Sequence, residues 1–213
     1  STVTIPTSNV VGGDHADEDS TVTFNTAVTA TTIVLNDQTG DAKMVFATAT
    51  ESTIAGTIRG HADNEGTIQV TAATKTFSGT IGASIDGTGY ALTLIDIDNT
   101  SIFNEAISAT NINVASGITA TAKKAITATA IVLDGGTLEL STTATATIAG
   151  TINGNDTTEG VLHISGANKT FSGAIGTSEI LTEIDIDGAT IFNGTIKTVT
   201  LDTAAAAHNT VRR

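Results

Sequence analysis

Two short strings in the sequence recur at one fixed separation. TIAGTI occupies Thr53–Ile58 and again Thr147–Ile152, and KTFSG occupies Lys75–Gly79 and again Lys169–Gly173, each pair 94 positions apart. Further on, IDID recurs at a separation of 89, and SIFN returns as TIFN at the same separation. A chain that repeats itself over such a distance folds by stacking similar units, because each unit buries its apolar face only against a neighbour.

The repeats also predict how the chain is organised. The separation changes by five residues between Gly82 and Leu94, and we expect an insertion there in a loop, where added residues cost little. The expected segments are an N-terminal capping or strand-exchange segment (1–20), a solenoid region (21–203) with two copies of about 90 residues (27–116 and 125–200), and a C-terminal tail (204–213).

The residues within each copy favour strands. Apolar and polar residues alternate in Leu92–Asp98 and Leu138–Leu140, which is the period of a strand with one buried face. Thr, Ile and Val are frequent and suit a pleated sheet. A period near 90 fits four to five coils of about 20 residues each. We therefore predict an all-β fold, a right-handed parallel β-helix (β-solenoid) built from tandem repeats.

The aromatic residues indicate where the core lies. All six phenylalanines belong to the repeated motifs, and a residue that recurs at equivalent repeat positions is normally interior. We expect a stacked apolar column made of Phe24, Phe46, Phe77, Phe103, Phe171 and Phe192.

Composition excludes several functions. A net charge of −13 opposes binding to nucleic acid or to anionic lipid, and no apolar run approaches membrane-spanning length. The absence of cysteine excludes thiol catalysis and cysteine-based zinc sites. The chain opens directly on a Thr/Val-rich stretch, so we expect a mature or excised part of an extracellular protein.

Three strings point to known proteins: ANKTFSGAIG (167–176), GATIFNGTIK (188–197) and TATATIAGTINGN (143–155). They resemble the passenger regions of autotransporters, filamentous-haemagglutinin-like adhesins and the repeats of bacterial surface-layer proteins, and also some marine phage structural proteins. This resemblance covers nearly all of residues 21–200. It implies a secreted β-solenoid with a structural or adhesive role on a cell or virion surface, and it carries no catalytic residues.

Paired carboxylates are the strongest candidates for chemistry. Asp96 and Asp98 are two positions apart, as are Asp185 and Asp187, and the intervening isoleucines should face inward and leave both carboxylates outside. Two such groups could bind Ca²⁺ or serve in glycoside hydrolysis, or they could simply be solvated. Their recurrence in both copies favours a structural cause over a single active site.

Two acidic segments add to these candidates. Asp14, Asp17 and Asp19 form a stretch dense in oxygen ligands that could hold Ca²⁺, and Gly60–Gly66, which contains His61 and Asp63, echoes it. The equivalent segment of the second copy has no histidine, which favours a solvated turn over a zinc site in Gly60–Gly66. The remaining histidines, His163 and His208, stand alone in the sequence and carry no signal.

Three functions compete. The first is a non-catalytic assembly unit, a rod, fibre or lattice element that binds copies of itself. The second is an adhesin for surface carbohydrate or a receptor, for which Tyr90 is the obvious aromatic contact. The third is a polysaccharide-degrading β-helix enzyme, which needs an unrepeated acidic cluster in one groove. Near-equality of the copies argues against the enzyme, so we expect a structural protein.

Overall fold

The computed structural model of the chain describes residues 2–4, 9–11, 20–35, 42–82, 90–204 and 209–211, and these residues form strands and turns without a helix. The all-β prediction is confirmed. A helix long and apolar enough to cross a membrane is likewise not found in these ranges. In chain order the strands are β1 (Thr2–Thr4), β2 (Asn9–Val11), β3 (Ser20–Phe24), β4 (Ala27–Leu35), β5 (Ala42–Phe46), β6 (Ser52–Gly60), β7 (Thr67–Val70), β8 (Lys75–Phe77), β9 (Leu92–Ile97), β10 (Ser101–Phe103), β11 (Ile107–Val114), β12 (Thr119–Ala122), β13 (Ile126–Leu133), β14 (Thr137–Leu140), β15 (Ala146–Gly154), β16 (Val161–Ile164), β17 (Lys169–Phe171), β18 (Leu181–Ile186), β19 (Thr190–Phe192), β20 (Thr198–Thr203) and β21 (Asn209–Val211).

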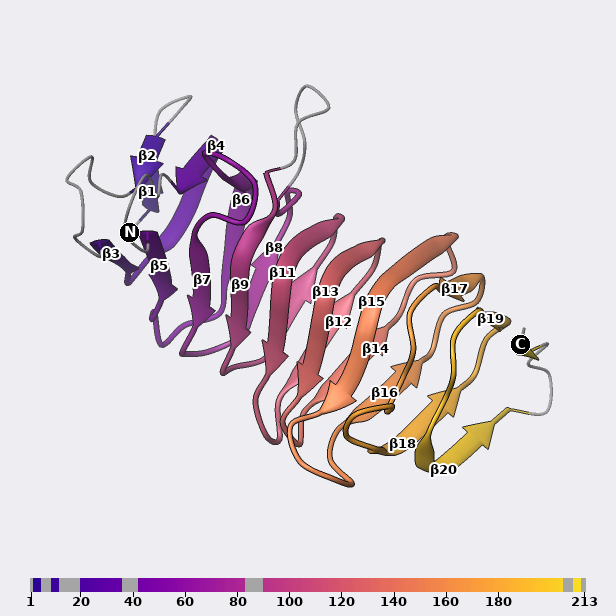
Figure 1. Cartoon of the computed structure of the whole chain (residues 1–213). Coiled ribbons are helices and arrows are strands. Elements are labelled where there is room, and N and C mark those ends of the chain that lie inside the picture. Colours follow the sequence, from indigo (N-terminus) through magenta and orange to yellow (C-terminus); the bar gives the residue numbers. More distant parts are fainter. Residues whose placement is uncertain are drawn as a thin grey trace.

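The strands stack as successive coils. Each pairs in parallel with strands on the neighbouring coils, and together they make a β-solenoid of about seven turns that runs from β1 at one end to β20 at the other (Figure 1). This confirms the predicted solenoid of parallel strands. At the first coil, β1 and β2 both pair with β4 of the same chain.

Following the pairs from coil to coil places the strands in three rows along the stack. The long strands β4, β6, β11, β13 and β15 turn a corner and so belong to two rows each. The short strands belong to one row: the first holds β3, β5, β7 and β9, the second holds β8, β10, β12, β14, β16, β18 and β20, and the third holds β17, β19 and β21.

The two sequence copies are offset by one row. Strand β7 in the first copy corresponds to β16 in the second, yet β7 lies in the first row and β16 in the second. Likewise β8 lies in the second row, whereas its counterpart β17 lies in the third. A step of 94 residues therefore amounts to whole turns plus one additional row, and equivalent surface residues of the two copies point in different directions.

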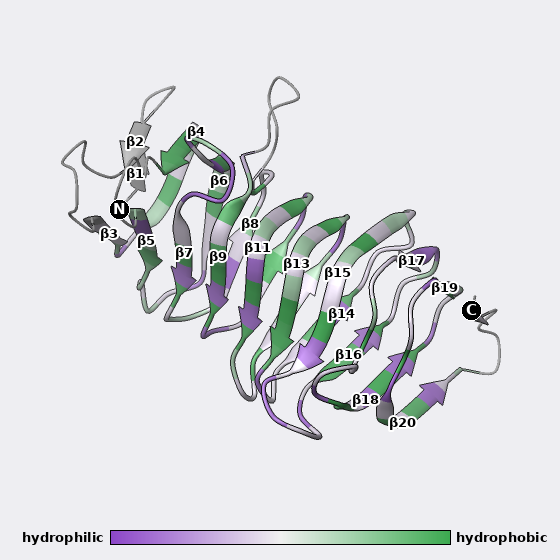
Figure 2. Ribbon diagram, in the orientation of Figure 1, coloured by the Kyte–Doolittle hydropathy of each residue, from purple (hydrophilic) through white to green (hydrophobic). Residues whose placement is uncertain are grey.

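Alternation along each strand builds the core. In β14, β16 and β18 the inward residues Leu138, Leu162 and Ile184 are register partners and are at most 3% exposed. Apolar residues alternate with polar ones along the ribbon (Figure 2), because successive strand residues face opposite sides of the sheet. The interior is therefore a set of apolar columns that run from coil to coil.

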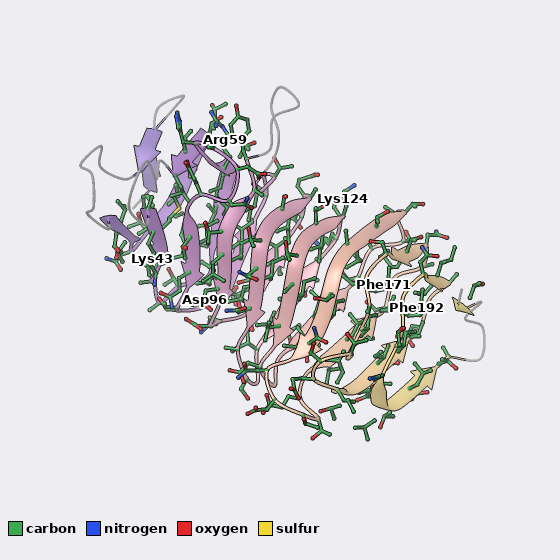
Figure 3. All side chains as sticks on the ribbon, in the orientation of Figure 1. Lys43, Arg59, Asp96, Lys124, Phe171 and Phe192 are labelled. Carbon is green, nitrogen blue, oxygen red and sulfur yellow. The ribbon has the colours of Figure 1, made fainter. Side chains whose placement is uncertain are left out.

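The predicted aromatic column is confirmed, in two parts. All six phenylalanines are at most 8% exposed. Ring centroids are 5.8 Å apart for Phe24 and Phe46, 5.4 Å for Phe46 and Phe77, and 5.0 Å for Phe77 and Phe103. In the second copy Phe171 and Phe192 stack at 5.0 Å (Figure 3). Three of these pairs are stacked and Phe46–Phe77 is edge-to-face, and both arrangements stabilise beyond the area that they bury.

The glycines of the two repeated strings lie against each other on neighbouring coils. A side chain on Gly79 of KTFSG would come within 2.1 Å of the carbonyl oxygen of Gly56 in TIAGTI, and Gly173 would come within 1.9 Å of that of Gly150. Gly56 and Gly150 in turn have positive φ angles, 106° and 104°. Neighbouring coils thus approach so closely at this corner that only glycine fits on either side.

The lysine of KTFSG is buried in both copies. Lys75 is fully buried and Lys169 is 1% exposed, and each ammonium group donates to backbone carbonyls of the adjacent turns. The carbonyl acceptors are those of Thr48, Thr50, Ala72 and Ala73 for Lys75, and those of Thr142, Ala144 and Ala167 for Lys169. Burial lowers the pKa of both lysines, and the carboxylate of Glu51 partly offsets this for Lys75. Each lysine ties together turns of two successive coils.

Candidate functional site

Asp96 lies on the outer face of β9, as predicted, and Asp98 directly follows the strand. Ile95 and Ile97 are buried, and Asp96 and Asp98 are half-buried on the opposite side. Gln69 of β7 is the register partner of Asp96 on the preceding coil. Its Nε2 atom donates to Asp96 Oδ2 at 3.1 Å and to Asp98 Oδ2 at 2.7 Å. One amide group thus bridges both carboxylates.

The two carboxylates are not equivalent electrostatically. Burial raises the pKa of Asp96 above its usual value of 3.8, and the negative charge of Asp98 adds to this effect. Lys43 of β5 and the hydrogen bond from Gln69 act in the opposite direction and offset part of the rise. Figure 3 shows Lys43 and Asp96 at the same edge of the stack. The ionised form of Asp96 therefore lowers the stability of the folded state.

Replacement of Asp96 by asparagine is expected to stabilise the protein at pH 7 and to have little effect at pH 3. A carboxyl group with a raised folded-state pKa stabilises the fold while it is protonated, below 3.8, and this contribution is lost as the pH rises through the folded-state value. Asparagine keeps an acceptor for Gln69 and carries no charge.

Denaturant unfolding of the wild type and Asp96→Asn at both pH values measures this difference. Asp156→Asn, at an exposed turn position, is the matched control and should change little. An equal effect of Asp96→Asn at pH 3 and pH 7 would show that charge burial is not the cause.

The second Asp pair also lies outside its sheet, but it meets a histidine. His163 of β16 is the register partner of Asp185 of β18. Its Nε2 atom lies 3.1 Å from Asp187 Oδ2 and 3.5 Å from Asp185 Oδ2. The expectation that His163 stands alone is therefore wrong: one coil of chain separates it from Asp185 and Asp187 in sequence, and coiling closes that distance.

His163 and Gln69 occupy the same position in the two copies. They are 94 residues apart, and each faces the Asp pair of the following coil. The copies thus share one surface arrangement with different chemistry at its centre: an amide that donates to both carboxylates in one, and an imidazole in the other. Ligand atoms of His163, Asp185 and Asp187 all lie within 4.8 Å of one another, which makes them a candidate metal-binding group.

Of the two acidic segments, the structure describes the turn after β6 and not the segment that contains Asp14, Asp17 and Asp19. Asp14, Asp17 and Asp19, like His208, lie outside the described residues, and their Ca²⁺ binding stays a prediction. In the turn after β6, Glu65 accepts a hydrogen bond from the backbone N–H of Ala62 at 2.7 Å, and Glu159 accepts one from Asp156 at 3.2 Å in the second copy. These carboxylates hold their own turns, as expected of solvated turns.

A broad groove lies on the outer side of β6 and β8. It has a volume of about 730 Å³, and hydroxyl groups dominate its lining, with Glu51 as its carboxylate. Tyr90, the aromatic contact expected of an adhesin, is half-buried. The guanidinium carbon of Arg59 lies 4.4 Å from the centre of the Tyr90 ring. One face of Tyr90 is thus already covered by a cation.

Comparison of the chain with protein-family models, with curated proteins and with solved structures gives no match. The fold and the site geometry are therefore the basis for any statement about function.

Proposed function

We propose that this chain is an extracellular structural protein, a rigid unit of a rod, fibre or lattice on a cell or virion surface, without catalytic activity. The observation that carries the proposal is the apolar surface of β20, the last described strand of its sheet, on which a further coil can stack. Val199 and Leu201 of β20 are 63% and 55% exposed, and among the described residues they are the large hydrophobic side chains left in solvent.

Leu201 continues an interior column. Its register partner is Ile184, which is fully buried and is itself paired with buried Leu162. The apolar column through β16 and β18 therefore reaches β20 and is uncovered on its far side. The strand also ends its sheet, so one edge of its backbone is unpaired in the described part of the chain. Open edges of this kind template the addition of a further strand.

The two ends of this sheet match each other. Its order runs from β1 to β20, and every pairing between them is parallel. The β20 edge of one copy can therefore pair with the β1 edge of the next in the same direction, which continues the ladder. A head-to-tail contact of this type does not close on itself and generates filaments.

Other features support a structural role over catalysis. Gln69 and His163 place the same surface arrangement on both copies, as expected of a repeated structural element rather than a single active site. A strongly acidic surface favours solubility outside the cell. Resemblance of the repeats to bacterial surface adhesins and surface-layer proteins agrees with this location. The hydroxyl-lined groove beside Glu51 is the feature that favours the adhesin as the second candidate.

Introduction of two lysines on β20 is expected to abolish self-association. In Val199→Lys/Leu201→Lys, positive charges replace two exposed apolar side chains. A stacked coil would cover the Leu201 position, which continues the interior column, and burying an unpaired charge there is costly. Light scattering over a concentration series, with electron microscopy of the concentrated samples, should show fibres or large assemblies for the wild type and monomers for the variant.

The matched control is Thr127→Lys/Thr129→Lys, which adds the same two charges at exposed positions of the central strand β13. It should assemble like the wild type. A wild type that stays monomeric at high concentration would contradict the assembly function and leave the adhesin as the better reading.

A further inference from the structure

We propose that His163, Asp185 and Asp187 bind one zinc ion that joins two successive coils. One ligand atom from each side chain takes part: the imidazole Nε2 and one carboxylate oxygen from each aspartate. The three side chains come from β16, from β18 and from the residue that follows β18, and none comes from the neighbouring strand β20, so binding there does not depend on the proposed assembly function.

The spacing of the ligand atoms suits a small tetrahedral ion. Ligands placed 2.0–2.1 Å from zinc in tetrahedral geometry lie about 3.3 Å from each other. The distances from His163 Nε2, 3.1 Å to Asp187 and 3.5 Å to Asp185, fall on either side of this value. Three protein ligands leave a fourth position for water, as in open zinc sites.

The chemistry of the donors selects the metal. Ca²⁺ takes six to eight oxygen ligands, whereas imidazole combined with carboxylates suits zinc and related transition metals. A nitrogen ligand at the centre of the group therefore changes the expected ion from the calcium that the Asp pair alone suggests to zinc.

The ligands stand on well-anchored strands. His163 lies between buried Leu162 and Ile164, and Asp185 lies between buried Ile184 and Ile186. Backbone pairing of β16 with β18 fixes the two strands in register. The imidazole is 32% exposed and the two carboxylates are 34% and 49% exposed, so an ion can reach the group from solvent.

The first copy supplies an internal comparison. Gln69 occupies the position of His163, and its Nε2 atom, a donor, points at both carboxylates of Asp96 and Asp98. In this orientation Gln69 offers the carboxylates an N–H donor and no lone pair for a cation, whereas His163 Nε2 can supply one, so we expect zinc in the second copy and not in the first. Gln69→His and His163→Gln each give one copy the central side chain of the other.

Titration of the chelator-treated intact chain with Zn²⁺ by isothermal calorimetry tests the proposal. His163→Gln, which copies the arrangement of the first copy, should lose one bound ion per chain or bind it more than about 100-fold more weakly, since loss of an outer-shell partner already costs about 10–100-fold. His61→Gln removes an exposed turn histidine and should bind like the wild type. Circular dichroism establishes that each variant is folded.

The reciprocal variant Gln69→His should gain one zinc ion per chain. Retention of all zinc binding in folded His163→Gln would overturn the proposal, and so would Gln69→His that binds no additional ion. The same titration with Ca²⁺ should show no dependence on His163. Equal loss of Ca²⁺ and Zn²⁺ binding in His163→Gln would overturn the assignment of zinc.

Discussion

Replacement of Phe77 by alanine is expected to lower the free energy of unfolding by about 3–5 kcal/mol, the range for emptying a buried aromatic site. Phe77 is 1% exposed and lies between the rings of Phe46 and Phe103. Backbone ladders on both sides fix the spacing of the coils, so the surrounding residues cannot close the cavity that the missing ring leaves. The loss should therefore lie toward the upper end of this range.

Guanidinium unfolding followed by circular dichroism measures the loss. Phe77→Leu, which keeps most of the volume, is the matched control and should cost less than about 1.5 kcal/mol. Phe171→Ala makes the same test in the second copy, where the ring stacks on Phe192. Unchanged stability in both alanine variants would mean that packing of these rings does not stabilise the folded state.

Replacement of Lys169 by methionine is expected to cost about 3 kcal/mol. Methionine has a similar length and keeps the packing of the side chain, but it leaves the three carbonyl groups of Thr142, Ala144 and Ala167 without their charged donor. An unsatisfied buried polar group costs about 1–3 kcal/mol. Removal of the ammonium group, which is itself costly to bury, offsets part of this sum.

The same unfolding experiment measures this cost, with Lys124→Met as its control. Lys124 is exposed, and its side chain projects from the stack (Figure 3). Its replacement should stay within about 0.5 kcal/mol of the wild type. If Lys169→Met proves as stable as Lys124→Met, the carbonyl groups do not depend on the lysine.

Local patterns were sufficient to predict the fold class and the core. Alternation in Leu92–Ile97 and recurrence of Phe77 and Phe171 are readable along the chain, because strand period and repeat position decide which side chains face inward. The outward direction of Asp96 and Asp185 follows from the same alternation. None of these inferences requires the pairing of distant residues.

Contacts between coils could not be predicted in this way. Gln69 and Asp98 are 29 positions apart, whereas the equivalent His163 and Asp187 are 24 apart. The coils differ in length, so the sequence does not reveal which residue of one coil faces which residue of the next. The contact of His163 with the second Asp pair was missed for this reason, although its alignment with Gln69 opposite a repeated Asp pair was an available signal.

The buried lysines were missed for a different reason. Lys169 belongs to a repeated string, but lysine is among the residues least often buried, and its acceptors Thr142 and Ala144 belong to the preceding coil. Exact recurrence of KTFSG, including a lysine, was the signal that the charge has a fixed internal role.

The one-row offset between the copies limits how many equivalent surfaces a single partner can reach. A flat partner, such as a neighbouring sheet of protein or a planar crystal of polysaccharide, touches one side of the rod, where it meets the Gln69 surface of the first copy or the His163 surface of the second, but not both. With three rows around the rod, a third tandem copy would face the remaining side, and a fourth would repeat the first. Duplication of this unit therefore places equivalent surfaces on successive sides of the solenoid axis. This arrangement suits contacts with neighbours on all sides better than multivalent binding to one surface.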